Sequence, residues 1–86
     1  MACFEVVWKR SAERELRKLP REAIAHLIAL AESLATDPRP PGARKLAGAD
    51  HTWRMRSGDY RLIYTVEDQR LIVQVVRVGH RREVYR

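Results

Sequence analysis

The sequence feature that most constrains the fold is a two-residue break, Gly58-Asp59, between two runs of alternating apolar and polar residues, 52–57 and 60–66. A glycine at the first position of such a break can adopt the positive φ of a type II′ turn, which joins the two strands of a tight β-hairpin. A two-residue turn leaves one register, in which Arg56 lies directly opposite Arg61. We therefore predict a hairpin whose strand pairing is fixed by its turn.

The predicted register divides the side chains of the hairpin between two faces, because opposed residues share a face and neighbours along a strand alternate. One face is the predicted core side, with Trp53, Met55, Tyr60, Leu62 and Tyr64. The other face holds Arg54, Arg56, Arg61 and Ile63. Like charges directly opposed in a sheet cost roughly 0.2–1 kcal/mol. We interpret this second face as an open surface that binds anions; a solvated arginine-rich face without a ligand is the alternative.

Two helices are predicted before the hairpin. Ser11 is a suitable N-cap for a short helix that ends at Leu19, after an apolar, β-rich run at residues 3–8. A second helix opens near Pro20 and ends near Thr36, with apolar residues recurring at 3.6-residue spacing. Two consecutive helices indicate a helical hairpin.

A stiff linker separates these helices from the strands, because three of the residues 37–42 are prolines. Residues 43–51 look irregular, and a further strand-like run at 71–78 follows the β-hairpin. A three-stranded antiparallel meander is the simplest pairing, which the first strand must join. The predicted fold is a single α+β domain over residues 1–86, with two layers in the order β-α-α-β-β-β: an antiparallel sheet with a helical hairpin packed on one face.

Composition excludes several classes of protein. The 86 residues carry a net charge of +6, and 11 of the 17 basic side chains lie in residues 37–86. The single cysteine, Cys3, cannot form an internal disulfide, which excludes a disulfide-stapled secreted scaffold. The sequence shows no membrane-length apolar run, no signal peptide and no zinc-ligand spacing, so we expect a cytoplasmic protein without membrane association, metal or cofactor.

The last segment, residues 80–86 (HRREVYR), adds more groups that suit phosphate chemistry. Arginine, which makes up 14 of the 17 basic residues, has a planar fork that matches phosphate, although high-GC coding also enriches it. His80 is the segment's only side chain that exchanges protons near neutral pH without help from its surroundings, so it is a candidate acid. A frayed basic C-terminus is the alternative interpretation.

Two segments resemble the RelE/ParE superfamily of type II toxin–antitoxin toxins, and most closely its RelE branch: residues 53–64 (WRMRSGDYRLIY) and 75–86 (VVRVGHRREVYR). The first strand, the helical hairpin and the proline-rich link also lie where that family has them. The resemblance implies a RelE-like fold and a metal-independent endoribonuclease that enters the A site of the 70S ribosome, cuts mRNA by 2′-hydroxyl attack and inhibits translation. It also implies a cognate acidic, RelB-like antitoxin in a hetero-oligomeric complex.

The resemblance further implies roles for individual residues. Arg61 matches the family's arginine that contacts the scissile phosphate, and Arg81 or Arg82 matches the arginine after the last strand. Tyr85 matches the near-terminal tyrosine that acts on the 2′-hydroxyl. The predicted catalytic residues are Arg61, His80, Arg81 and Tyr85, and the predicted RNA or phosphate contacts are Lys45, Arg54, Arg56 and Arg82.

The proton transfers of such a cleavage leave two interpretations open. An arginine cannot exchange a proton near neutral pH, so either Tyr85 and His80 do this work or cleavage rests mainly on charge stabilisation. A free phenol ionises well above neutral pH, but nearby guanidinium groups favour its phenolate. Two other functions also fit the fold and the charge: a ParE-like toxin that poisons DNA gyrase without cutting RNA, and a non-catalytic RNA-binding module.

Overall fold

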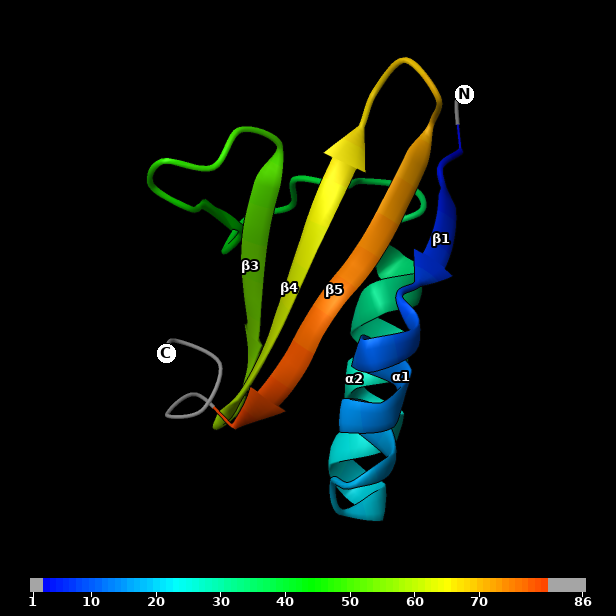
Figure 1. Ribbon diagram of the computed structural model, residues 1–86, viewed down its shortest axis with the longest axis vertical. Coiled ribbons are helices and arrows are strands. Elements are labelled where there is room, and N and C mark those ends of the chain that lie inside the picture. Colours follow the sequence, from blue (N-terminus) through cyan, green and yellow to red (C-terminus); the bar gives the residue numbers. More distant parts are fainter. Residues whose placement is uncertain (1–2, 81–86) are drawn as a thin grey trace.

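Two helices cover one face of a five-stranded sheet in the computed structural model, which describes residues 3–80 (Figure 1). The elements along the chain are β1 (Glu5–Trp8), α1 (Arg10–Arg17), α2 (Arg21–Ser33), β2 (Arg44–Lys45), β3 (Thr52–Ser57), β4 (Tyr60–Glu67) and β5 (Ile72–His80). The strands lie side by side in the order β1-β5-β4-β3-β2. The predicted two-layer α+β fold is confirmed.

The sheet is mixed, whereas the prediction was an antiparallel sheet. β3, β4 and β5 form the predicted antiparallel meander, and the short β2 adds to β3 in the antiparallel sense. β1 instead pairs in parallel with β5, so that Val6 lies opposite Val73. Adjacent strands joined by a short turn must be antiparallel, but the long connection from β1 through both helices permits a parallel pair.

The helix boundaries differ from the predicted ones, since α1 ends at Arg17 rather than Leu19 and α2 ends at Ser33 rather than near Thr36. Lys9, not Ser11, is the N-cap of α1; its N–H donates to the Val75 carbonyl at 2.9 Å, so the strand pairing continues up to the residue where the helix begins. Pro20 is the N-cap of α2, which ends at Ser33. Neither helix, nor any other in residues 3–80, is long and apolar enough to cross a membrane.

The core lies between the helices and one face of the sheet. Its largest fully buried side chains are Leu27, Leu34, Leu62, Tyr64, Val66, Val73, Val75 and Val78. Met55 is buried with them, and Trp53 and Tyr60 pack against the same cluster, which confirms the predicted core side of the hairpin. Burying each such aliphatic side chain contributes about 1.5–3 kcal/mol, so the apolar alternation of β3 and β4 holds the register in place.

The proline-rich linker is tied to the end of the sheet where β4 and β5 are joined. The buried Tyr64 hydroxyl donates to the Pro38 carbonyl at 2.7 Å, and burial raises the pKa of Tyr64 to about 12. Arg39 forms an ion pair with Asp68 and lies 5.5 Å from the centre of the Trp53 ring. The hydrogen bond from Arg39 lowers the pKa of Asp68. The linker therefore closes one end of the core.

Replacing Tyr64 by Phe removes the hydroxyl and leaves the buried Pro38 carbonyl without its donor. We expect the free energy of unfolding to fall by about 1 kcal/mol near neutral pH. Between about pH 10 and pH 12 the unfolded chain has lost the phenol proton that folded wild type retains, so wild type loses stability as the pH rises. The unfolding free energy of wild type minus that of the variant should therefore fall by about 2–3 kcal/mol across this window.

Urea denaturation of wild type and Tyr64→Phe at a series of pH values measures this difference directly. Comparing the two proteins removes the contribution of the other groups that titrate above pH 10. A difference in unfolding free energy that stayed constant across the window would contradict the burial of this phenol.

Candidate arginine-rich anion-binding site

The β3–β4 turn builds the predicted arginine-bearing face. Arg56 lies opposite Arg61, and Arg54 lies opposite Ile63, as the two-residue turn requires. Gly58 has a φ of +60°, and it alone of the two turn residues has a positive φ, which is the pattern of a type II′ turn. These arginines lie on the sheet face turned away from the helices.

The strand register extends this face over two more strands. Arg44 of β2 lies opposite Arg54, and Arg77 of β5 lies opposite Ile63. We term the set Arg44, Arg54, Arg56, Arg61 and Arg77 the arginine face. An anion that binds across it would contact side chains from four neighbouring strands.

Two members of the arginine face were missed in the sequence. Arg44 lies in a segment that looks irregular, because its strand has only two residues. Arg77 lies beyond a register shift in β5, where Ile63 pairs with Arg77 but Tyr64 pairs with Val75. Strict alternation from the core residues Val73 and Val75 would have placed Arg77 on the core side. A charged residue at an expected core position was the available signal for this bulge.

Arg61 is buried, with 7% of its surface exposed, although the prediction placed it on an open face. It lies on the interior strand β4, between Arg56 of β3 and Gly79 of β5, whereas Arg44 and Arg56 are exposed. Alternation predicts which face a side chain joins, but not how deeply its neighbours cover it. A guanidinium group shielded from water attracts an anion more strongly than an exposed one does.

Arg77 is held at the edge of β5 by a carboxylate from α1. Its Nε and Nη2 atoms each lie 3.1 Å from Glu15 Oε2, and Glu15 Oε1 accepts the Val78 N–H at 3.2 Å. The pairing of β1 with β5 ends at Val75, so Glu15 takes the place of a strand at the next part of this edge. The ion pair orients Arg77 and leaves Nη1 pointing outside the pair.

Two predicted site residues lie on the other face of the sheet. His80 is opposite Tyr60, and their rings meet edge to face at 5.9 Å, so His80 lies on the helix side rather than beside Arg61. Lys45 is opposite Trp53, which also places it on the helix side, and its Nζ lies 4.0 Å from Asp50. The face of each residue depends on strand pairing that the sequence alone did not specify. The predicted Arg81, Arg82 and Tyr85 lie outside the described residues.

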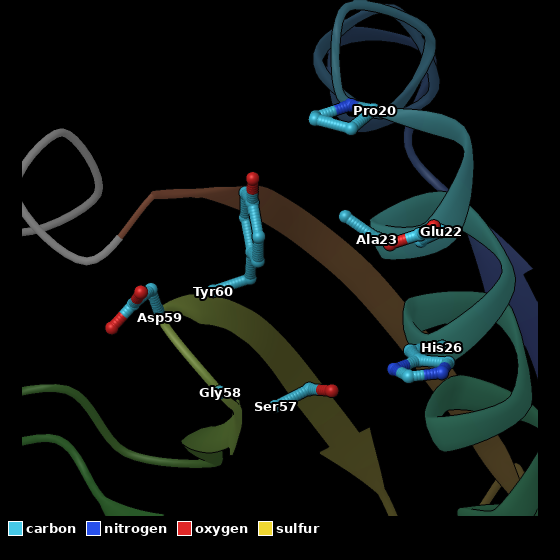
Figure 2. Close-up of a pocket in the computed structure, with 8 residues that line it drawn as sticks. All are labelled: Pro20, Glu22, Ala23, His26, Ser57, Gly58, Asp59 and Tyr60. Atoms are coloured by element: carbon cyan, nitrogen blue, oxygen red, sulfur yellow. The ribbon is translucent and has the colours of Figure 1, made fainter.

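A groove of about 320 Å³ lies on the helix side, between the start of α2 and the β3–β4 turn (Figure 2). His26 projects toward it from α2, and Tyr60, Glu22 and Asp59 are among the other residues that line it. The lining of this groove includes acidic residues and no arginine, so it differs in charge from the arginine face. No three or more His, Cys, Asp or Glu side chains within residues 3–80 come together as metal ligands would.

Comparisons with known proteins identify relatives over nearly the whole chain. The family model for the ParE toxin of the type II toxin-antitoxin system, parDE, matches residues 6–85. Toxin RelG of Mycobacterium tuberculosis is 36% identical, over 96% of this chain and 97% of RelG. The toxin–antitoxin complex RelBE2 of the same organism contains a chain that matches with a TM-score of 0.81 and 30% identity, over 93% of each chain. The isolated E. coli RelE toxin matches with a TM-score of 0.79 and 31% identity, over 98% of this chain and 92% of RelE.

Replacing Arg56 by Gln tests the electrostatic cost of this face. The change removes a like-charge pair across β3 and β4, so we expect the free energy of unfolding to rise by roughly 0.2–1 kcal/mol at low ionic strength. The gain should diminish between about 0.01 M and 1 M salt, because salt screens the repulsion. Urea denaturation at both salt concentrations measures it.

The matched control is Arg14→Gln, which removes an exposed arginine from α1, away from the sheet pairing. Its effect should lie within about 0.5 kcal/mol of zero. A loss of stability in the Arg56 variant at low salt would contradict the repulsion.

Proposed function

This chain belongs to the ParE toxin family within the RelE/ParE superfamily, as a toxin of a type II toxin–antitoxin system, and we propose that it is a RelE-type endoribonuclease that cuts mRNA in the ribosomal A site. The observation that carries this proposal is the arginine face, whose buried Arg61 has exposed or half-buried arginines around it. Relatives at 30% identity or more also bear RelE-type names. Inhibition of translation in the cytoplasm follows from such an activity.

Arginines can stabilise the negative charge that develops when RNA is cleaved by attack of its own 2′-hydroxyl. The 2′-oxygen forms a bond to phosphorus while the bond from phosphorus to the 5′-oxygen breaks, which gives a 2′,3′-cyclic phosphate and a 5′-hydroxyl. Negative charge builds on the phosphoryl oxygens as the new bond forms, before the bond to the 5′-oxygen is fully broken. The shielded Arg61, with Arg54 and Arg56 beside it, would stabilise that charge, and no metal ion is needed for this role.

The proton transfers fall to groups beyond the strands. His80 lies across the sheet from Arg61, which disfavours direct contact of both with one phosphate. We therefore propose that Tyr85 removes the 2′-hydroxyl proton, with Arg81 or Arg82 as the additional phosphate contact that favours its phenolate. The leaving 5′-oxygen takes up a proton from water as its bond to phosphorus breaks, and the proton that Tyr85 removed returns to solvent.

We also propose that a cognate acidic, RelB-like antitoxin binds this toxin in a hetero-oligomer. The net charge of +6 favours an acidic partner, since opposite charges speed association and select the partner. The similar chain from M. tuberculosis RelBE2 was solved in a toxin–antitoxin complex. An antitoxin that covered the arginine face would also block access of RNA to it.

Poisoning of DNA gyrase is the second candidate, because the matching family model is described as a ParE toxin. Such a protein would bind its target without cutting RNA. A non-catalytic RNA-binding module is the third, since a basic face alone is sufficient for that function. The three candidates differ in what happens to messages and DNA in a growing cell.

Induction of the protein in growing bacteria, with mapping of the 5′ ends of translated messages, tests the proposal. Wild type should produce codon-phased cuts and arrest growth. Arg61→Met, which keeps side-chain bulk at this buried position, should slow cutting by about 10²–10³-fold. Tyr85→Phe should slow it by about 10²–10⁴-fold, because the phenol can no longer transfer a proton.

Controls separate loss of activity from loss of folding and from the other candidates. Arg14→Gln should retain wild-type cutting, and circular dichroism of both inactive variants should show cooperative unfolding. Growth arrest with intact messages and an SOS response would favour gyrase poisoning. Intact messages without arrest would contradict both toxic activities and leave the binding module.

A further inference from the structure

A hollow of about 740 Å³ lies at the end of the sheet where β4 and β5 are joined. Figure 1 shows this loop at the opposite end of the sheet from the β3–β4 turn. Both acids in the lining are paired, since Arg70 bonds to Glu67 at 3.2 Å and Arg39 bonds to Asp68. The other polar side chains in the lining are His51, Thr65, Gln69 and Gln74.

The hollow adjoins the arginine face, because two of its lining residues share that side of the sheet. Thr65 of β4 lies opposite Gln74 of β5 and opposite Thr52 of β3. Along β4, Thr65 is two residues from Ile63, the residue paired with both Arg54 and Arg77. A neutral row of Thr52, Thr65 and Gln74 therefore runs beside the row of Arg44, Arg54 and Arg77.

The dimensions of these rows match a segment of single-stranded nucleic acid. The arginine row crosses four strands, or three steps of about 4.8 Å, which gives about 14 Å between its outer members. This length corresponds to the rise of about four stacked nucleotides at roughly 3.4 Å each. The neutral row lies about 7 Å away, two residues along β3 and β4 and three along the bulged β5, which leaves room for a sugar between a phosphate and its base.

The two rows also differ in the chemistry that they offer. Arginine forks bind phosphates without regard to sequence. Hydroxyl and amide groups can also bind the edges of bases, and a glutamine amide pairs best with adenine, to which it can donate and accept together. The Gln74 amide makes no hydrogen bond to any other described residue, and Glu67 and Asp68 are already paired with Arg70 and Arg39.

We propose that the hollow is a base-reading subsite for single-stranded RNA, with adenine as the preferred base. Gln74 and Thr65 bind the base edge, while Arg54 and Arg77 hold neighbouring phosphates, the latter through the guanidinium side turned away from Glu15. The subsite rests on the proposed ribonuclease function and adds the determinant that selects where a message is cut. Its position predicts that the backbone of the RNA crosses the strands rather than running along them.

Binding of the full chain to short RNA probes tests the subsite without cleavage. The probes are six-nucleotide runs of A, C, G or U whose 2′-hydroxyls are methylated, so the attacking group is absent. Fluorescence anisotropy of wild type should show the tightest binding to the A probe. Gln74→Ala should weaken binding to this probe by about 5–100-fold and to the other probes by much less.

Arginine variants provide a second readout. Arg77→Gln should weaken binding to all four probes alike and reduce the slope of log affinity against log salt by about 0.7. The Gln74 variant should leave that slope unchanged, and Arg14→Gln should change neither quantity. An equal loss on all four probes in Gln74→Ala, or no preference in wild type, would overturn the proposed subsite. Thermal unfolding of each variant reports whether it is folded.

Mapping of cut sites in cells separates failure of the subsite from failure of the ribonuclease function. If Gln74→Ala cuts messages with the wild-type distribution of sequences around the cuts, the subsite is wrong and the ribonuclease function stands. If wild type cuts no message but still prefers the A probe, the ribonuclease function is wrong and base reading stands. If the cuts made by Gln74→Ala shift away from adenine, the result supports both the subsite and the ribonuclease function.

Discussion

The pairing of β3 with β4 is the constraint on which both the core and the arginine face depend. A slip of one residue would turn Leu62 and Tyr64 outward and bring Arg61 into the core. Burial of the apolar set therefore stabilises the one register that also gathers the arginines on the opposite face. Repulsion between Arg56 and Arg61 opposes this pairing by a smaller amount than apolar burial contributes to it.

Ion pairs and hydrogen bonds from other segments hold one end of the sheet and the edge of β5 in place. At one end, Arg39 and Tyr64 fasten the proline-rich linker, which leads directly into β2 and thereby places Arg44. At the edge of β5, Glu15 both satisfies the Val78 N–H and orients Arg77. Residues remote from any phosphate thus set the positions of the outer members of the arginine face.

Local sequence rules were sufficient for the elements and for the hairpin register, because a two-residue turn and an apolar alternation depend on near neighbours. They were insufficient where distant segments decide the outcome. The parallel pairing of β1, the bulge that turns Arg77 outward and the burial of Arg61 all depend on neighbours far along the chain. His80 was assigned to the arginines by its closeness in sequence to Arg81, but strand pairing places it beside Tyr60.

The parallel pairing of β1 with β5 also orders the events of folding. β1 is synthesised before both helices and the hairpin, whereas β5, the strand that it pairs with, follows all of them. The helices and the hairpin can form from local contacts, but this edge of the sheet closes only after β5 has been made. The closure joins the two paired strands that lie farthest apart in the sequence, so it carries the largest loss of chain entropy and is expected late. A chain synthesised only as far as β4 therefore lacks both β5 and the Glu15 contact that orients Arg77.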